Sequence, residues 1–206
     1  MLVFSPQNLA FLAVPKTGTT AIEMALKSRA DIIFTKRRKH MTAQRFHNQM
    51  APFLAASFDL RPERIAVMRE PEEQLRSWYR YRQRVDKDGA PRSTIGMSFD
   101  AFVQGLIDSD DPPFGGVGSQ YRFLTSARGE VLVHRLFAYE HQPQFRAFLE
   151  DRFEEKLDIR QRNVSPTVEA PLDPATRTRL KERRADEFAL YERVMSTDGP
   201  LLTSIG

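Results

Sequence analysis

The stretch FLAVPKTGTTAIEMAL, residues 11–26, decides the fold that we expect for this chain. It opens inside a short apolar run, residues 8–14, which is typical of a strand buried on both faces of a parallel sheet, and Pro15 ends that run. From Thr19 onward the apolar residues recur at helical spacing. The stretch therefore predicts a strand that turns directly into a helix, which is the basic unit of an α/β protein.

The turn between this strand and this helix has the composition of an anion-binding site. A helix start presents unpaired backbone N–H groups, and Gly18 allows a positive φ or a close approach of a ligand. Lys16 adds a positive charge. Hydroxyl donors come from Thr17, Thr19 and Thr20. Together they predict a nest for one tetrahedral anion, although a plain turn with a solvated lysine has the same short pattern.

This turn is not a Walker A loop. That loop has the pattern G-x-x-x-x-G-K-[ST], in which the lysine follows the glycines. Here the lysine precedes a single glycine and the loop is shorter. We therefore expect it to hold one phosphate-like group, and we do not expect it to wrap a triphosphate with magnesium.

A second strand–helix unit follows at residues 64–82. RIAVMRE, residues 64–70, is a buried-strand pattern that ends at Arg69, and Pro71 opens a helix that carries Ser77 two turns further on. An arginine fork can bind a phosphate through two hydrogen bonds, and a serine hydroxyl can complete the contact. Taken alone, Arg69 also fits a surface ion pair with Glu70 or Glu73.

The rest of the chain continues the alternation of strands and helices. Further strands are predicted at 31–34 and 130–140, and further helices at 41–55, 99–108, 143–153 and 173–195. This order predicts an α/β fold, with a mainly parallel central sheet flanked by helices and ligands bound at the carboxyl ends of the strands. We expect a single domain over residues 1–206, with a flexible tail at about 197–206.

Composition limits the classes of function. The chain has 206 residues, 41% hydrophobic and 28% charged, which is typical of a globular domain. It has no cysteine, which excludes disulfides and thiol catalysis, and its net charge of +4 favours anionic ligands. No run approaches the ~18 apolar residues of a membrane span, and the N-terminus lacks a basic region and a cleavage site. We expect a cytoplasmic protein without a membrane span.

Two motifs resemble those of sulfotransferases that use 3'-phosphoadenosine 5'-phosphosulfate (PAPS). PKTGTT resembles their phosphosulfate-binding loop, and REPEEQLRSWYR resembles their 3'-phosphate motif, in which a serine follows the arginine by eight positions. Arg69 and Ser77 keep that spacing, and Glu70 replaces the commoner aspartate. KHMTAQRF, residues 39–46, resembles the histidine segment of the carbohydrate-type branch, and other segments resemble small bacterial members.

The resemblance implies a three-layer, P-loop-like fold that binds PAPS as co-substrate across the strand ends. The phosphosulfate would lie on residues 16–20 and the 3'-phosphate on Arg69 and Ser77. The segment RQRNVS, residues 160–165, would supply a third contact, for which Arg162 is favoured over Arg160, Asn163 and Ser165. No metal is expected. The acceptor would be a hydroxyl of a small molecule or glycan, and the basic run TKRRKH at 35–40 favours an anionic one. Because the chain is short for this family, its acceptor pocket is either reduced or completed by a second subunit in a homodimer.

Sulfuryl transfer is an in-line displacement in which positioning and electrostatics do most of the work, as in phosphoryl transfer. Lys16 is predicted to neutralise the leaving phosphate oxygen. His40 is predicted to be the general base, although it also fits a surface histidine at the end of the basic run. Glu23 is the alternative base, but a glutamate early in a helix needs no catalytic explanation. His134, inside an apolar strand, is expected to be structural.

Two rival functions remain open. A P-loop nucleotide kinase would depend on magnesium, but the chain lacks both GK[ST] and an obvious Walker B aspartate. A non-catalytic nucleotide- or RNA-binding module would have a basic groove whose affinity falls steeply with salt. RSWYRYRQR, residues 76–84, interleaves arginines with aromatics as such a surface does. On a helix it is more simply explained by Trp78 and Tyr81 facing inward, so no nucleic-acid partner is expected.

Overall fold

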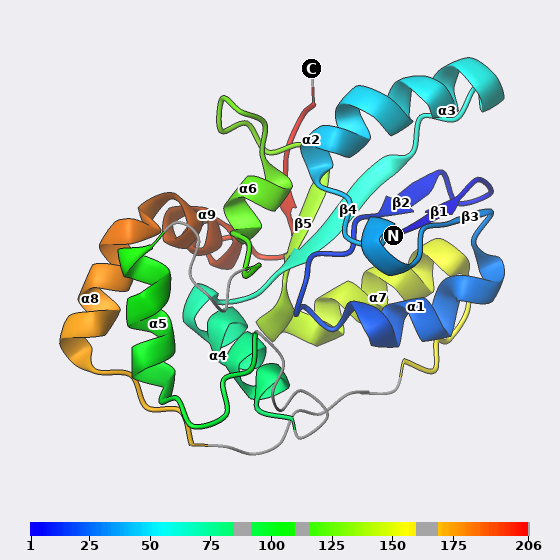
Figure 1. Ribbon diagram of the computed structural model, residues 1–206. Helices are drawn as coiled ribbons and strands as arrows, with labels where there is room; N and C mark the ends of the chain where they lie inside the picture. Colours follow the sequence, from blue (N-terminus) through cyan, green and yellow to red (C-terminus); the bar gives the residue numbers. More distant parts are fainter. Residues whose placement is uncertain (85–91, 110–115, 160–168, 206) are drawn as a thin grey trace.

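A computed structural model describes residues 1–84, 92–109, 116–159 and 169–205. It has an α/β fold with one six-stranded sheet in the order β3-β1-β2-β4-β5-β6 (Figure 1). The strands are β1 (Leu2–Phe4), β2 (Leu9–Phe11), β3 (Ile32–Ile33), β4 (Glu63–Met68), β5 (Arg135–Ala138) and β6 (Leu201–Leu202).

The sheet is mixed, which corrects the expectation of a mainly parallel one. Its centre is parallel, because β2 pairs with β4 and β4 with β5 in the same direction. The outer pairings, β3 with β1, β1 with β2 and β5 with β6, are antiparallel. The strand–turn–helix units predicted from the sequence therefore occupy the centre, the unpredicted strands β1 and β6 flank it, and the predicted strand β3 forms one edge.

The unexpected first strand belongs to a hairpin. Leu2 pairs with Phe11 and Phe4 pairs with Leu9, so the N-terminal apolar residues lie beside β2. The turn of the hairpin lies at residues 5–8. The Asn8 N–H donates to the Ser5 carbonyl oxygen at 3.0 Å, and Asn8 has a φ of 46°. Asparagine tolerates this left-handed conformation better than most residues.

Most of the predicted helices are present. The helices are α1 (Thr19–Leu26), α2 (Ala43–Arg45), α3 (Ala51–Phe58), α4 (Pro71–Arg82), α5 (Phe99–Asp108), α6 (Gln120–Leu124), α7 (Gln142–Phe153), α8 (Pro174–Arg183) and α9 (Ala185–Met195). Further short helical segments among the described residues are η1 (Lys27–Arg29), η2 (Lys36–Arg38), η3 (Phe46–Met50) and η5 (Tyr139–His141). Pro71 stands at the first turn of α4, and the Glu70 carboxylate caps that helix by accepting from the Glu73 N–H at 2.6 Å.

The single long helix predicted at 173–195 is wrong, because the chain breaks at Arg184, where φ is −119° and ψ is 32°. The two halves bury different faces: Leu180 of α8 packs with the α4–α5 cluster, whereas Leu190 of α9 packs against the sheet. At the break, the buried Glu187 accepts from the Gln120 N–H at 3.0 Å, which ties α9 to α6.

The described part of the predicted flexible tail contains a strand. Leu201 of β6 pairs with Leu136 of β5, and the Thr203 N–H donates to the His134 carbonyl oxygen at 3.1 Å. This correction concerns residues 197–205, because residue 206 lies outside the described residues. A pairing partner that is distant in sequence leaves no local signal in the tail itself.

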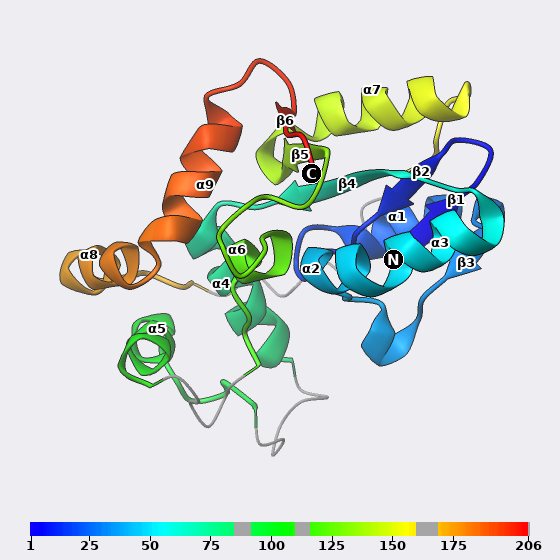
Figure 2. The same cartoon turned by 90° about the horizontal axis from the view of Figure 1, so that it is seen from above.

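Alternate residues of the central strands face opposite sides of the sheet and bury two separate cores. On β2, Leu9 and Phe11 pack toward α1 and α7, whereas Ala10 packs toward α2, α3, α6 and α9. Figure 2 shows α7 on one side of the sheet and α2, α3 and α6 on the other. A third apolar cluster joins α4, α5 and α8, which Figure 1 shows together away from the sheet.

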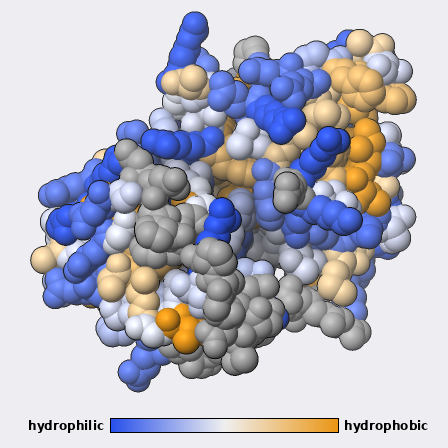
Figure 3. Space-filling model, in the orientation of Figure 1, coloured by the Kyte–Doolittle hydropathy of each residue, from blue (hydrophilic) through white to orange (hydrophobic). Residues whose placement is uncertain are grey.

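On the face of Figure 3, hydrophobic colour gathers over α3 and β3. Phe53 and Phe58 of α3 are 50% and 62% exposed and contact each other edge-to-face at 5.7 Å between ring centroids. Ile33 of β3 is 39% exposed. In the described part of the chain, no helix is both long enough and apolar enough to cross a bilayer.

Candidate functional site

The candidate site lies where the three parallel strands end. Strands β2, β4 and β5 are neighbours in the sheet and run in the same direction, so their carboxyl ends meet at one edge. The loop at residues 15–20 follows β2, Arg69 follows β4, and Tyr139 follows β5. Ligands of open α/β sheets bind at such an edge.

The loop at 15–20 has two residues in the left-handed region. Gly18, the residue before α1, has a φ of 74°, and Lys16 has a φ of 69°. A lysine in that region costs about 1 kcal/mol, so surrounding contacts must hold it there. The Thr17 hydroxyl donates to the Val14 carbonyl oxygen at 3.0 Å, and Thr17 is buried. This hydroxyl therefore stabilises the loop from within.

Tyr139 joins the two predicted motifs. A Cβ added at Gly18 would lie 3.2 Å from the Tyr139 Cε2 atom, so only glycine lets the loop pack this closely. Arg69 contacts the same ring, because its guanidinium carbon lies 4.6 Å from the ring centroid. The loop at 15–20 and Arg69 therefore both adjoin Tyr139. The sequence reasoning gave Tyr139 no role.

Arg69 has a fixed backbone and an unsatisfied side chain. The Gln120 amide is almost fully buried and contacts both backbone groups of Arg69: its Nε2 donates to the Arg69 oxygen at 2.8 Å, and its Oε1 accepts from the Arg69 N–H at 2.9 Å. The Arg69 Nε is buried and has no hydrogen-bond partner among the described residues. The alternative ion pair is present, but it joins Nη2 to Glu73 at 3.6 Å and leaves Nε unpaired.

Ser77 lies on α4, half-buried, two turns after Arg69. Its hydroxyl makes no hydrogen bond within the described residues. The start of α4 is held to the end of β5, because the Glu70 N–H donates to Glu140 Oε1 at 3.0 Å. This contact fixes the start of the helix that carries Ser77 relative to Tyr139.

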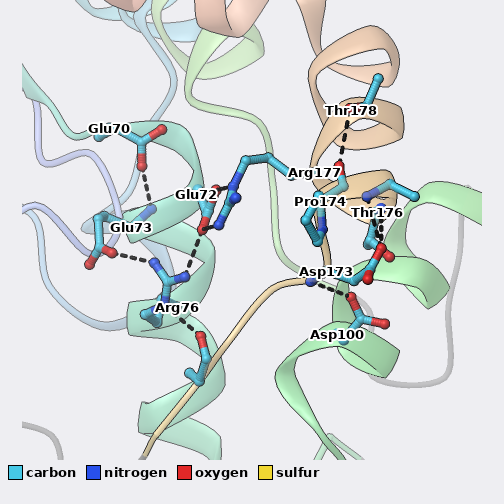
Figure 4. A network of polar contacts seen from close by, with 12 residues as sticks. Glu70, Glu72, Glu73, Arg76, Asp100, Asp173, Pro174, Thr176, Arg177 and Thr178 are labelled. Carbon is cyan, nitrogen blue, oxygen red and sulfur yellow. Dashed lines mark hydrogen bonds and ion pairs between the residues drawn. The ribbon is translucent and has the colours of Figure 1, made fainter.

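Another side of α4 carries the polar network drawn in Figure 4. Glu72 accepts from Arg76 at 2.6 Å and from Arg177 of α8 at 2.7 and 3.2 Å. Arg76 Nε also donates to the Ala170 carbonyl oxygen at 3.0 Å. Burial alone would raise the pKa of Glu72, but the two arginines outweigh it and lower that pKa. The network fixes the orientation of α4 and thus which of its side chains face the loop.

The Lys16 ammonium lies against α4. Its Nζ is 4.4 Å from the Tyr81 ring centroid and 5.4 Å from that of Trp78, within cation–π range. Burial, followed by repulsion from Arg69 and other nearby arginines, lowers the Lys16 pKa to about 8. Trp78 packs against the cluster of α4, α5 and α8 as expected, although it is only half-buried. Tyr81 is also half-buried, and the neighbouring Tyr79, 4% exposed, belongs to that cluster.

His40 lies beside the carboxyl end of β2. Its Nδ1 is 2.6 Å from the Ala13 carbonyl oxygen, which can only accept, so Nδ1 carries the hydrogen and Nε2 can accept a proton. Burial of the ring lowers the pKa of His40, and the bond to Ala13 only partly opposes it. The neutral form therefore predominates at pH 7. Glu23, the alternative base, is engaged by Lys39 at 2.7 Å.

Three further predictions have different outcomes. His134 is structural in geometry, since its Nδ1 accepts from the Arg64 N–H at 2.8 Å. Arg162 lies outside the described residues, as do residues 85–91 and 110–115.

The basic run at 35–40 borders a cavity of about 120 Å³, lined by Leu2, Glu23, Lys27, Ile33, Phe34, Thr35, Lys36 and Lys39. The alternative base Glu23 lines it, whereas Lys16, His40 and Arg69 do not.

Among the described residues no group of three or more histidine, aspartate or glutamate side chains could hold a metal ion. The strand ends bring together a loop in which Lys16 and Gly18 have left-handed backbone angles, and Arg69, which has an unsatisfied donor. His40 lies beside the same end of β2. Comparison of the whole chain with protein-family models, with curated proteins and with solved structures found no match.

Proposed function

We propose that this protein is a sulfotransferase that moves a sulfuryl group from PAPS to a hydroxyl of a small molecule or glycan. The observation that carries the proposal is that the loop at 15–20 and Arg69 both lie against the Tyr139 ring. A single nucleotide with a phosphate at each end requires two anion sites that adjoin in this way. The helices packed on both faces of the sheet agree with the three-layer, P-loop-like fold that the proposal includes.

The residues present fit the co-substrate. The Arg69 Nε needs an acceptor, and a buried donor without one costs about 1–3 kcal/mol. A 3'-phosphate would supply that acceptor, and Ser77 offers a second donor from α4. At the other end, Gly18 gives the backbone room and the first N–H groups of α1 point out of the helix start. PAPS itself supplies the activated sulfuryl group.

The proposed chemistry divides between Lys16 and His40. In the in-line displacement the acceptor oxygen bonds to sulfur as the bond from sulfur to the phosphate oxygen breaks. Lys16 neutralises the charge that gathers on that phosphate oxygen. His40 Nε2 takes the proton from the acceptor hydroxyl, while the bond from Nδ1 to the Ala13 oxygen holds the ring in the required tautomer.

The proposal is tested by ligand-induced stabilisation. We expect adenosine 3',5'-bisphosphate, at 100 times its dissociation constant, to add ~2.7 kcal/mol to the free energy of unfolding. For a chain of this size that raises Tm by roughly 5–10 °C, whereas ATP with magnesium should raise it little. Stabilisation by ATP with magnesium alone would support a phosphotransferase instead. Equal, strongly salt-dependent stabilisation by any polyanion would support the nucleic-acid-binding alternative.

The role of His40 is tested separately. We expect His40→Ala to keep the affinity for the bisphosphate and to lower turnover by about 10²- to 10⁴-fold, because only the proton transfer is lost. His47 on η3 is a matched control, since its Nδ1 lies 3.0 Å from Arg64 Nη1, away from the site. His47→Ala should leave turnover unchanged. Normal turnover of the His40 variant would show that another group is the base.

A further inference from the structure

Helix α4 holds the loop at 15–20 through one buried side chain, Gln74. Its Nε2 donates to the Pro15 carbonyl oxygen at 3.1 Å, and the residue is 1% exposed. Pro15 immediately precedes Lys16, whose φ of 69° is strained. The hydrogen bond thus acts on the peptide that sets the direction of the lysine.

The same face of α4 continues to the lysine ammonium. Trp78 and Tyr81 follow Gln74 at positions i+4 and i+7, a spacing that puts the three side chains on one side of a helix. Gln74 contacts the backbone before Lys16, and the two rings contact its Nζ at 5.4 and 4.4 Å. One helix face therefore contacts both ends of the lysine, and that helix begins directly after Glu70, next to Arg69.

Core packing alone does not explain why residue 74 is a glutamine. Its Oε1 is buried and has no hydrogen-bond partner among the described residues, a state that costs about 1–3 kcal/mol. An apolar side chain of similar length would fill the same space without this cost. The amide is useful only through the hydrogen that Nε2 donates to Pro15.

We propose that Gln74 is a positioning residue, which holds the loop so that the Lys16 ammonium rests on the Trp78 and Tyr81 rings beside Arg69. The position of the lysine is a property of the protein without ligand, whereas its use in catalysis rests on the proposed function. Helix α4 then determines the distance between the two anion sites, because it holds the loop through Gln74 and carries Ser77 itself.

The chain contains one tryptophan, Trp78, so its fluorescence reports directly on the nearby ammonium. In a pH titration without ligand, we expect an inflection close to pH 8 in the unmodified protein and none in Lys16→Met. The charged groups that face Lys16 are the guanidinium groups of Arg69, Arg82 and Arg84, and the Tyr81 ring lies against its ammonium. A missing inflection in the unmodified protein would overturn the proposal.

The decisive variant is Gln74→Met, which keeps the length of the side chain and removes the donor. We expect its inflection to move upward toward the ordinary lysine value, because the ammonium leaves the rings for water. Gln104→Met is the matched control: Gln104 is exposed on α5 and donates to Asp100 at 2.7 Å, so its loss should leave the inflection in place. An unchanged inflection in Gln74→Met would contradict the positioning role.

Binding of the bisphosphate gives a second readout. Loss of one net hydrogen bond should weaken it in Gln74→Met by about three- to tenfold. If the unmodified protein does not bind the bisphosphate while Gln74→Met still moves the inflection, the proposed function fails and the positioning role stands. If the unmodified protein binds and Gln74→Met equals it in affinity and inflection, the proposed function stands and the positioning role fails.

If Gln74→Met does not fold, the positioning role can still be tested by a measurement on the unmodified protein. In a ¹⁵N-resolved spectrum the Gln74 side-chain amide protons should exchange slowly with solvent, because they are buried and one is bonded to Pro15. They should also shift when Lys16 is replaced by methionine. Rapid exchange, or no response to Lys16→Met, would overturn the positioning role.

Discussion

Arg69→Ala is expected to weaken binding of adenosine 3',5'-bisphosphate by about 10²- to 10⁴-fold, which corresponds to two charge-assisted hydrogen bonds at ~1.5–3 kcal/mol each. The physical reason is the state of this side chain: its Nε is a buried donor without a partner in the described residues, and Gln120 fixes the backbone that carries it. A preorganised arginine loses little freedom on binding an anion. Isothermal titration calorimetry at fixed ionic strength measures the effect.

Two variants separate geometry from charge in this experiment. Arg69→Lys keeps the charge but cannot form two parallel hydrogen bonds, so it should recover only part of the lost affinity. Arg179→Ala removes an arginine whose partner is Asp108, at 2.5 Å and away from the strand ends, and should bind as the unmodified protein does. Should Arg69→Ala retain full affinity, the assignment of the 3'-phosphate to this strand end is wrong.

Lys16→Met is expected to lower turnover by about 10²- to 10³-fold, because removal of one group that stabilises developing charge costs ~3–4 kcal/mol. Above pH ~7, where the phosphates of the ligand are ionised, the affinity of the unmodified protein for the bisphosphate should fall as the pH rises through about 8, where Lys16 loses its proton. A bound anion favours the charged form, so the fall extends above that value. Lys16→Met should lack this pH dependence.

Lys16 also makes the stability of the protein depend on pH, and this dependence has the opposite direction to that of the affinity. Its pKa in the folded protein, about 8, lies below the ordinary value, so between pH 8 and roughly 10 the unfolded chain holds a proton that the folded chain has released. Raising the pH across this window stabilises the ligand-free protein through Lys16 while it weakens anion binding. Lys27→Met, which removes an exposed lysine after α1, should show neither change. If stability and affinity changed in the same direction as the pH rises, the assignment of both effects to Lys16 would be wrong.

Local patterns in the chain predicted the central units of the fold. The apolar run before Pro15 and the helical spacing after Thr19 correspond to β2 and α1, and the run that ends at Arg69 corresponds to β4. These predictions succeed because a buried parallel strand needs a continuous apolar run, and a helix start needs its own capping residues nearby. Strands β1 and β6 were not predicted, since their pairing partners are set by the sheet and not by the strands themselves.

The sequence by itself determined which side chains are present for binding and proton transfer: Lys16 and Gly18 in the turn, Arg69 at a strand end, and His40. Only the tertiary structure decided their surroundings, because each decisive contact joins residues far apart in the chain. Gln74 and Pro15 are 59 positions apart, and Gln120 and Arg69 are 51 apart. A pattern of neighbours records local conformation, whereas a contact across a sheet edge depends on where every intervening element packs.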